Sequence, residues 1–518
     1  MDLTKLIDTP SSSGVEPADR HNVLFATSEV APFAKTGSLG DVAASLPKAL
    51  CDRGHRVSLF APLYGHLDPA DLHLGRRLTT LEVPRKSKHQ SKVEATIWEG
   101  RISEDVRIFF VQADDHFGGD GVLEYGAGDA DPDACDRYAF FSRAIVEFVR
   151  QFDIPFDVVH CHDWHTALAP VYRSHYFADS LDDTSFVLTI HNLAYQGEFD
   201  AETFEQTGLP RKFDDADELL HDGSLNFLKG GIKYADRINT VSPTYAEEIR
   251  TESGGEGLHA ELDARGDELT GILNGVDYSV WSPDHDKFIP VRYDREGLNG
   301  KRRNKAELQH RFGLAIRPMI PLVSFVGRLS EQKGLDILLP AIEELLEGID
   351  DPKDGFQVLF LGEGDSKYED KIRELADTHD RWVGAHLGYH ESLAHLYQAG
   401  SDMLLAPSKS EPCGLTQLYA MRYGTLPIAH KTGGLADTVV DVDSGDPDST
   451  GFVFDDFDVR PLRQTIERAL NRYTNYRQWR PLMERAMKQD FSWGRSADAY
   501  ADLYDEATGR EVRSEAAE

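Results

Sequence analysis

Two consecutive loops between residues 408 and 440 carry side chains that could do chemistry. In the first loop, Glu411 lies three residues before Gly414, and a helical pattern runs from Leu415 to Arg422. After a short apolar strand pattern, the loop Lys431-Thr432-Gly433-Gly434 leads into another helix. Helix starts offer unpaired N–H groups to an anion, and ligands bind at the carboxyl ends of parallel strands. The pattern predicts a carboxylate beside an anion-binding loop; a tight turn with a solvated glutamate is the alternative.

Two cations follow another buried strand pattern, in the loop from Gly327 to Gly334. Arg328 and Lys333 on this loop could point at one ligand, and two cations can stabilise a diphosphate leaving group without a metal ion. A surface loop of mixed charge is the alternative. In a chain with many more acidic than basic residues, basic residues concentrated at a strand end favour the functional interpretation.

Three histidines, His160, His162 and His165, surround Asp163 and have the composition of a metal site. The spacing argues against one, because no Cys pair or helical His-Glu motif completes a ligand set. We expect this strand end to contact a sugar instead, with Asp163 pointing into a cleft and Trp164 packing. The next strand end carries His191 and Asn192, which we expect beside it.

Loops of this kind lie at the carboxyl ends of parallel strands. The sequence agrees, because strand and helix patterns alternate in both halves. Near the N-terminus, a strand from Val23 to Ser28, a helix from Asp41 to Asp52 and a strand from Arg56 to Phe60 form a βαβ unit. Its loop reads Lys35-Thr36-Gly37-Ser38-Leu39-Gly40-Asp41, and the later half carries Lys431-Thr432-Gly433-Gly434-Leu435-Ala436-Asp437. This match in spacing predicts two similar α/β halves that face each other.

The other patterns complete an α/β fold with two Rossmann-like, doubly wound domains. We expect antiparallel strands between Leu81 and Val111, a helix from Arg137 to Arg150, a strand with an Asn-Gly turn from Gly271 to Asp277, and a last amphipathic helix over residues 491–507. The periodicity breaks between Trp281 and Pro321, where prolines and a basic patch from Lys301 to Lys305 occur. The predicted domains are therefore residues 21–290 and 305–490, followed by the helix 491–507.

The composition limits the class of protein. The chain has 518 residues, which favours two or three domains, and 55 basic against 89 acidic residues give a formal net charge of -34. This charge argues against nucleic-acid and anionic-membrane partners, because both need clustered Lys and Arg. A strongly acidic folded surface suggests a halophilic protein that works at high salt, where the repulsion between its charges is screened.

The four cysteines, Cys51, Cys135, Cys161 and Cys413, have no metal-ligand spacing and no paired framework, which fits a reducing cytoplasm. The sequence contains no apolar stretch of signal-peptide or bilayer-spanning length, so we expect a soluble, cytoplasmic protein. A nucleophile elbow, a Walker loop and a dinucleotide fingerprint are all absent from the sequence, which disfavours hydride transfer.

Eight motifs together resemble the signatures of the bacterial and plant glycogen/starch synthases, and the resemblance runs from about Val23 to Tyr504. In chain order they are KTGSLGDVAASLP, HCHDWHTAL, TIHNLAYQG, VSPTYAEEI, LNGVDYSVWSP, VGRLSEQKG, SEPCGLTQLYAMRYGTLPI and KTGGLADTV. Several of these motifs are specific to this family, whereas wider relatives share mostly the Glu-x-x-Gly element and the Arg and Lys of the diphosphate site.

The resemblance implies the GT-B arrangement, in which two Rossmann-like domains border a deep cleft and the last helix crosses back onto the first domain. It implies that the N-terminal domain binds the glucan acceptor and the C-terminal domain the nucleotide-sugar donor. The implied reaction is retaining transfer of α-glucose to the non-reducing 4-hydroxyl of an α-1,4-glucan, such as glycogen or a maltooligosaccharide. ADP-glucose is the implied donor, with UDP-glucose left open, and no metal or other cofactor is expected.

The resemblance also assigns roles to residues. Arg328 and Lys333 would neutralise the departing diphosphate, and Glu411 would contact the transferred glucose. Asp163 and His191 are the other implied catalytic residues. The implied substrate and nucleotide-sugar ligands are Lys35, Gly37, Asp41, Asn192, Asn274, Cys413, Gly414, Leu415, Thr416, Gly433 and Gly434. For Cys413, a small buried thiol is an equal alternative to a reactive role.

One position departs from the family pattern, because the first loop normally has two adjacent glycines and here the second is Ser38, with Gly40 two residues later. If this position needs a positive φ or close backbone approach, Ser38 would strain or reposition the loop. Three other functions stay open from the sequence. They are another retaining GT-B enzyme that makes sucrose, trehalose or a small glucoside, a non-catalytic nucleotide-sugar or glucan-binding protein, and a phosphorylase-like enzyme with a lysine-bound pyridoxal phosphate.

Overall fold

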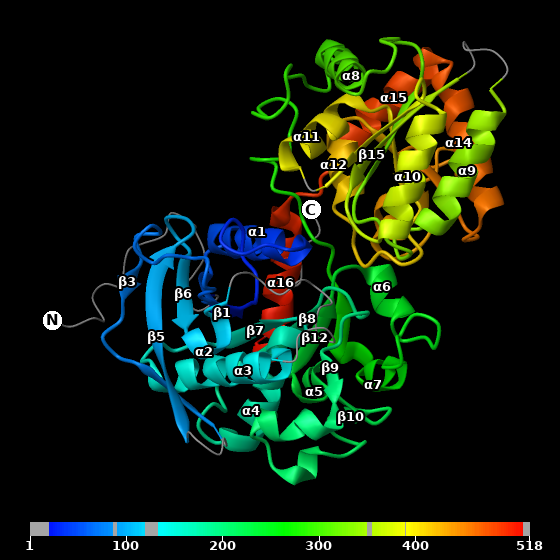
Figure 1. Cartoon of the computed structure of the whole chain (residues 1–518). Coiled ribbons are helices and arrows are strands. Elements are labelled where there is room, and N and C mark those ends of the chain that lie inside the picture. The colour runs from blue at the N-terminus through cyan, green and yellow to red at the C-terminus, as the bar shows by residue number, and fades with distance from the viewer. Residues whose placement is uncertain (1–19, 86–90, 120–132, 350–354, 389, 511–518) are drawn as a thin grey trace. The chain divides into compact units, whose positions relative to one another are not determined.

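The computed structural model describes residues 20–85, 91–119, 133–349, 355–388 and 390–510, which form two compact units (Figure 1). The first unit contains the chain up to Val241, Ala246–Gly275 and the segment from Trp493 onward. The second contains Ser242–Tyr245 and Val276–Ser492. The chain therefore changes unit at Gly275, earlier than the predicted break between 290 and 305, because residues such as Val276 and Ile289 are buried in the core of the second unit.

The first unit is built on a ten-stranded sheet with the order β13-β12-β8-β7-β1-β2-β6-β5-β3, and β4 pairs with β5. The strands from β13 to β6 run parallel, whereas β3, β4 and β6 are antiparallel to β5, as predicted for residues 81–111. The strands are β1 (Asn22–Ala26), β2 (Arg56–Pro62), β3 (Gly75–Arg76), β4 (Leu81–Pro84), β5 (Lys92–Arg101), β6 (Arg107–Gln112), β7 (Val158–His162), β8 (Ser185–Ile190), β12 (Arg237–Thr240) and β13 (Leu269–Gly271).

Helices cover both faces of this sheet. On one face, Val23 and Phe25 of β1 share a core with α1 and with α16, which lies beside α1 (Figure 1). On the other face, Phe60 and Phe109 pack their rings 4.8 and 5.0 Å from Phe148 of α3. The helices are α1 (Ser38–Asp52), α2 (Asp114–Phe117), α3 (Ala134–Gln151), α4 (Leu168–Tyr176), α5 (Phe227–Tyr234), α7 (His259–Ala264) and α16 (Trp493–Thr508).

Shorter elements extend the first unit. A small antiparallel sheet has the order β10-β11-β9, with β9 (Glu198–Asp200), β10 (Leu220–His221) and β11 (Ser224–Asn226). Helix α6 (Pro243–Glu248) follows β12 in the chain. The predicted strand over 271–277 ends at Gly271, so Asn274 lies in a loop after β13.

The C-terminal helix α16 packs in the first unit through polar contacts as well as its apolar face. The Tyr504 hydroxyl lies 2.9 Å from Nδ1 of His160 on β7, and Ser496 Oγ donates to Leu273 O at 2.6 Å. The Arg53 guanidinium at the end of α1 binds the Asp498 carboxylate. The buried His160 contact and the exposed Arg53 pair together attach the last helix to β7 and to the end of α1.

The second unit is built on a six-stranded, fully parallel sheet with the order β16-β15-β14-β17-β18-β19. Apolar side chains fill both faces, with Val323 in the larger core and Leu322 in a smaller core beside α8 and α11. The strands are β14 (Leu322–Val326), β15 (Gln357–Gly362), β16 (Val383–Leu387), β17 (Met403–Ala406), β18 (Leu426–His430) and β19 (Phe452–Phe454). The helices are α8 (Asn299–Arg311), α9 (Leu335–Glu347), α10 (Ser366–Thr378), α11 (Glu391–Gly400), α12 (Thr416–Arg422), α13 (Gly433–Thr438), α14 (Val459–Tyr473) and α15 (Tyr476–Lys488).

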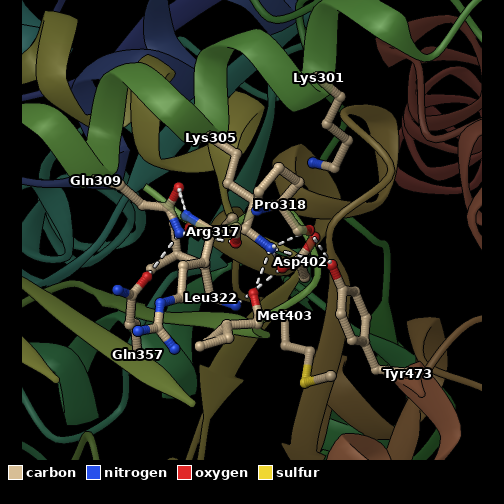
Figure 2. A network of polar contacts seen from close by, with 12 residues as sticks. Lys301, Lys305, Gln309, Arg317, Pro318, Leu322, Gln357, Asp402, Met403 and Tyr473 are labelled. Carbon is tan, nitrogen blue, oxygen red and sulfur yellow. Dashed lines mark hydrogen bonds and ion pairs between the residues drawn. The ribbon is translucent and has the colours of Figure 1, made fainter. Parts of the chain in front are cut away.

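The predicted basic patch at 301–305 contains two buried lysines, because α8 packs over the amino ends of β14 and β17 (Figure 2). Lys305 Nζ lies 2.6 Å from Asp402 Oδ2, and the same oxygen accepts from the Leu322 amide at 2.8 Å. Lys301 Nζ donates to Thr425 Oγ1 at 2.7 Å, and the carbonyl oxygens of Gln398 and Ala399 lie 3.3 and 3.4 Å from it. Burial lowers the pKa of Lys301 to about 7.

Candidate active site

In the second unit, the ends of two neighbouring strands bring a cation and a carboxylate together. The loop after β14 carries Lys333, and the loop after β17 carries Glu411. Lys333 Nζ lies 2.5 Å from Glu411 Oε2, and Ser408 Oγ donates to the same oxygen at 2.8 Å. The Glu411 residue is only 8% exposed, so its carboxylate is held inside the unit.

Gly334 explains how the cation loop reaches this carboxylate. It has a φ of +75°, and a Cβ at this position would lie 2.0 Å from Pro407 O. Glycine therefore allows the backbone of the Lys333 loop to touch the chain directly after β17. The amide of Lys409 donates to Gln332 O at 2.9 Å and ties the same two loops together. Arg328 lies on the same loop with an exposed side chain.

Directly after Glu411, the backbone turns sharply before α12 begins at Thr416. Gly414 has a φ of +73°, and Gln417 Nε2 donates to the carbonyl oxygens of Cys413 and Gly414 at 2.9 and 2.8 Å. In the described part of the chain, the amides of Gly414, Leu415 and Thr416 donate to no other group. These amides lie next to the Glu411 carboxylate, and their N–H groups could bind a ligand. The Cys413 side chain is buried, at 4% exposure.

The second glycine loop differs from its prediction. A Cβ at Gly433 would lie 2.1 Å from Glu411 O, and one at Gly434 would lie 2.1 Å from Cys413 O. The Gly434 amide is not unpaired, because it donates to Glu411 O at 3.0 Å. The prediction that this amide is open to an anion is therefore wrong. The two glycines instead let the loop pack directly on the backbone that carries Glu411.

In the first unit, Asp163 and His191 meet at the carboxyl ends of β7 and β8. Asp163 has a φ of +57°, uncommon for a residue other than glycine, and its Oδ1 accepts from the His191 amide at 2.7 Å. Burial raises the pKa of Asp163 well above its usual range, and the nearby Glu29 charge adds to this, whereas hydrogen bonds from the His191 and Asn192 amides oppose it. The backbone conformation and burial are typical of a residue held for a function.

Three predicted site residues in this unit have a buried polar atom without a hydrogen-bond partner in the described protein. They are Asp163 Oδ2, His191 Nδ1 and Asn274 Oδ1. Buried polar atoms are normally paired, so such atoms mark places where a ligand or water completes the contacts. The Asn192 side chain instead accepts from the Ala194 amide at 3.1 Å, and its backbone amide binds Asp163.

The histidines around Asp163 form buried hydrogen bonds. His160 contacts the hydroxyls of Tyr504 and Thr189 at 2.9 and 2.6 Å, and His162 Nδ1 lies 2.9 Å from His191 Nε2. Burial lowers the pKa of His160 and of His191 to about 3, so both are neutral. Within the described ranges, no group of three or more His, Cys, Asp or Glu side chains is arranged to hold a metal ion. Trp164 packs at 1% exposure, as predicted.

The first Lys-Thr-Gly loop is held by a residue that sequence reasoning missed. Lys35 Nζ lies 2.7 Å from Asp41 Oδ1 within the loop, whereas Glu29 accepts from the backbone amides of Thr36 and Gly37 at 2.8 and 3.1 Å. No motif in the sequence singled out Glu29, which lies in the loop after β1. The expected strain at Ser38 is absent, because Ser38 is the first residue of α1 and has no positive φ.

Two family models match the two halves of the chain. The starch synthase catalytic domain matches residues 22–264, and glycosyl transferases group 1 match residues 307–483. The glycogen synthase of Anaeromyxobacter sp. (strain Fw109-5) is 42% identical over 484 residues, which cover 93% of this chain and 98% of the relative. The chain belongs to the glycogen/starch synthase family. It is therefore a glycosyltransferase, and the family resemblance of the sequence motifs is confirmed.

Other members of the family agree over similar lengths. The glycogen synthase of Thermodesulfovibrio yellowstonii (strain ATCC 51303 / DSM 11347 / YP87) is 40% identical over 501 residues, which cover 94% of this chain and 98% of the relative. The family match extends over both α/β units, so the glycogen/starch synthase activity class applies to the whole chain.

Solved structures confirm the fold class. The catalytic domain of starch synthase IV from Arabidopsis thaliana, bound to ADP and acarbose, matches with a TM-score of 0.86 at 34% identity. The match covers 95% of this chain and 100% of that one. Sucrose-phosphate synthase from Thermosynechococcus elongatus shares the fold at a TM-score of 0.59 and 18% identity. In the described segments, no helix is both long and apolar enough to cross a bilayer.

Proposed function

We propose that this glycogen/starch synthase transfers glucose from ADP-glucose to the non-reducing 4-hydroxyl of an α-1,4-glucan, with retention of the α configuration and with no metal or other cofactor. The observation that carries the proposal is the contact between Lys333 and Glu411, at 2.5 Å, between loops of adjacent parallel strands. A cation and a carboxylate at one point match a reaction that develops negative charge on a phosphate and positive charge on a sugar carbon.

The proposed reaction breaks the bond between the anomeric carbon and the diphosphate oxygen, and the acceptor oxygen forms a new bond to that carbon. The diphosphate leaves with the bonding electron pair, and the hydroxyl proton of the acceptor is released. Lys333 and Arg328 stabilise the leaving diphosphate. Glu411 and the amides of Gly414 and Leu415 face the transferred glucose, where the carboxylate stabilises positive charge at the anomeric carbon. The site then has opposite charges for the two ends of the breaking bond.

The first unit carries predicted site residues of its own. Asp163, His191 and Asn274 offer buried polar atoms to sugar hydroxyls. Neutral His191 can donate or accept one hydrogen bond at Nδ1, which suits a hydroxyl better than a phosphate. Lys35 and Gly37 line the nucleotide phosphates, and Asp41, which holds Lys35, orients the ammonium.

The choice of donor and acceptor is supported by the Arabidopsis relative, whose structure contains ADP and acarbose. An adenine nucleotide and a glucan-like oligosaccharide bound to a protein of the same family favour ADP-glucose over UDP-glucose here. We further propose that the enzyme works in a cytoplasm of high salt, because a net charge of -34 needs screening.

A donor and acceptor panel tests the proposal. Purified enzyme is given ADP-glucose or UDP-glucose with glycogen, maltooligosaccharide, fructose or glucose, and nucleotide diphosphate release is measured over a salt series. We expect release with ADP-glucose and glycogen, and a product that an α-1,4-specific amylase digests. Release with fructose or glucose alone would favour a sucrose, trehalose or small-glucoside synthase. No release with any pair would leave a binding protein, and full activity and stability without added salt would contradict the high-salt proposal.

A further inference from the structure

We infer that Glu29 is the positioning residue that holds the first Lys-Thr-Gly loop in its ligand-binding shape; this inference rests on the proposed function. Glu29 follows β1 and is 1% exposed. Its Oε2 accepts from the amides of Thr36 and Gly37 at 2.8 and 3.1 Å, and its Oε1 accepts from Thr36 Oγ1 at 2.6 Å. All three of these donors lie on the loop that carries Lys35.

Two of the three groups around this buried carboxylate are amides that can only donate, and the third is a hydroxyl that can donate or accept. An ionised glutamate offers two oxygens and no hydrogen, so it can accept all three bonds. A glutamine at position 29 has no charge, so its bonds to the two amides would be weaker, and its NH2 group would reverse the bond to the Thr36 hydroxyl. The carboxylate also lies before α1, at Ser38, where the helix dipole favours a negative charge. These contacts therefore favour a carboxylate over an amide at position 29.

Backbone hydrogen bonds restrain the segment between Glu29 and the loop. The Glu29 carboxylate is therefore itself held in place and can fix the position of the loop. Glu29 is itself held, because its carbonyl accepts from Thr27 Oγ1 at 2.8 Å and its amide donates to that oxygen at 3.2 Å. The Ala31 amide donates to Gly40 O at 3.0 Å on the far side of the loop. The far end of the loop is thus fixed to the segment after β1, and the Glu29 carboxylate fixes its middle.

The consequence concerns phosphate recognition. The amides of Thr36 and Gly37 are used by Glu29, so they do not form the anion site that a glycine loop before a helix suggests. In this loop the phosphates are contacted by the Lys35 ammonium and the first turn of α1, and Glu29 sets where both lie. In this inference Glu29 acts through the loop, because its carboxylate is bound to Thr36 and Gly37. If Glu29 acted only through its charge, it would repel the phosphates, and removing the charge would lower the KM for the donor. If Glu29 acts by positioning the loop, its replacement raises the KM for the donor.

The test compares Glu29→Gln with a matched control, Glu147→Gln. Glu147 is also 1% exposed in the first unit, but its carboxylate binds Arg143, Arg150 and Gln151 of its own helix, α3. For Glu29→Gln we expect at least about a tenfold rise in the KM for ADP-glucose and less than about a twofold change in the KM for glycogen. Glu147→Gln should lower Tm but leave the donor KM within about twofold of the wild type.

A milder variant, Thr36→Val, removes one of the three bonds and keeps the loop amides. Its donor KM should rise less than that of Glu29→Gln, and the double variant should equal Glu29→Gln within about twofold, because both act through one contact. Independent, multiplying effects would overturn the inference. So would an unchanged or lowered donor KM in Glu29→Gln, or a rise of equal size in Glu147→Gln.

Hydrogen exchange separates this inference from the proposed function. In Glu29→Gln, amides in the peptide covering residues 35–41 should exchange at least about tenfold faster than in the wild type and in Glu147→Gln. If the wild type released no nucleotide with any donor, the proposed function would fail while the exchange result still decided the role of Glu29. Unchanged exchange would overturn that role, whatever the activity.

Discussion

The two Lys-Thr-Gly loops, residues 35–41 and 431–437, share their spacing but are held by different forces. In the first loop, the Glu29 side chain accepts from the amides of Thr36 and Gly37, and Ser38 begins a helix of 15 residues. In the second, the loop packs backbone against backbone, with the Gly434 amide bound to Glu411 O. The first loop is therefore held by a charged side chain, and the second by close approach that only glycine permits.

This difference shows that a repeated motif need not repeat its physical role. Close backbone packing in the second loop fixes the chain that carries Glu411, so its glycines serve the carboxylate. The first loop leaves its serine free to start α1 and presents a cation, Lys35, that is paired with Asp41. We expect substitutions in the second loop to affect turnover and those in the first to affect donor binding.

The largest expected effect tests whether chemistry lies beside the second loop. Replacing Glu411 or Lys333 by Ala should lower kcat by at least about tenfold to a hundredfold, because each removes charge stabilisation from one end of the breaking bond. Circular dichroism and Tm should show an intact fold. Steady-state rates of ADP release with glycogen measure the effect, and near-normal turnover in either variant would remove that residue from the proposed site.

Exchanging the residues at one of the two positions where the loops differ, Ser38 and Gly434, sharpens the comparison. In Gly434→Ser, the new Cβ would lie only 2.1 Å from Cys413 O, so the Glu411 loop must move. We expect kcat to fall by at least about tenfold. Ser38→Gly makes the first loop like the family pattern and should change kcat and donor KM by less than about twofold. Steady-state kinetics and Tm are measured for both variants. Equal losses of kcat in the two variants would show that the two loops are held in the same way.

The lysines that open the two loops provide a smaller contrast. Lys35 is paired with Asp41 at 2.7 Å and its side chain is 29% exposed, whereas Lys431 is 61% exposed and lies 3.2 Å from Asp455. Lys35→Ala should raise the donor KM by about fivefold to tenfold, as for one partly exposed charged hydrogen bond. Lys431→Ala should change it by less than about twofold. A larger effect at Lys431 would reverse the assignment of the loops.

The smallest effect on activity is expected at Lys301, which lies at the amino ends of the strands of the second sheet. A change there tests the stability of the second unit without touching the proposed site. Burial lowers the pKa of Lys301 to about 7, below its unfolded value, so the unfolded chain binds more protons between about pH 7 and pH 10. The free energy of unfolding should therefore rise with pH over this range, by at most about 1.4 kcal/mol per pH unit.

Lys301→Met should remove this pH dependence and leave kcat within about twofold of the wild type, because the residue lies away from the strand ends that carry the site. Denaturant unfolding at pH 7, 8, 9 and 10 measures the slope. A wild type and a variant with parallel pH dependence would show that Lys301 stays charged in the folded protein.

Much of the fold was predictable because it follows local periodicity. The strands β1, β7 and β8, the helix after the first loop and the antiparallel region around β5 all lie where apolar patterns placed them. Helix ends were less predictable: α1 begins at Ser38 rather than Asp41, because Glu29 from outside the helix binds the preceding amides. The domain boundary was also misplaced, since residues 276–290 pack by tertiary contacts that no local pattern reveals.

Some residues of the candidate site were predictable from the sequence, and others were not. Motif spacing identified Lys333, Glu411, Asp163 and His191, and the structure brings the first two and the last two into contact within their own units. Glu29 carried no signal of its own, because an acidic residue in a polar loop is ordinary until its burial is known. The two buried lysines of α8 are the converse case, since a basic stretch suggests a solvated surface.

The sequence by itself determined the chemical groups, their order on alternating strands and helices, and the family to which they belong, because each of these depends on residue types at short range. Only the tertiary structure decided which hydrogen-bond donors are already used. The Gly434 amide binds Glu411 O and the Thr36 and Gly37 amides bind Glu29, and each bond joins segments that local patterns treat as separate. Burial makes such pairings necessary, because an unpaired polar group away from water is costly, and burial is a property of the folded chain.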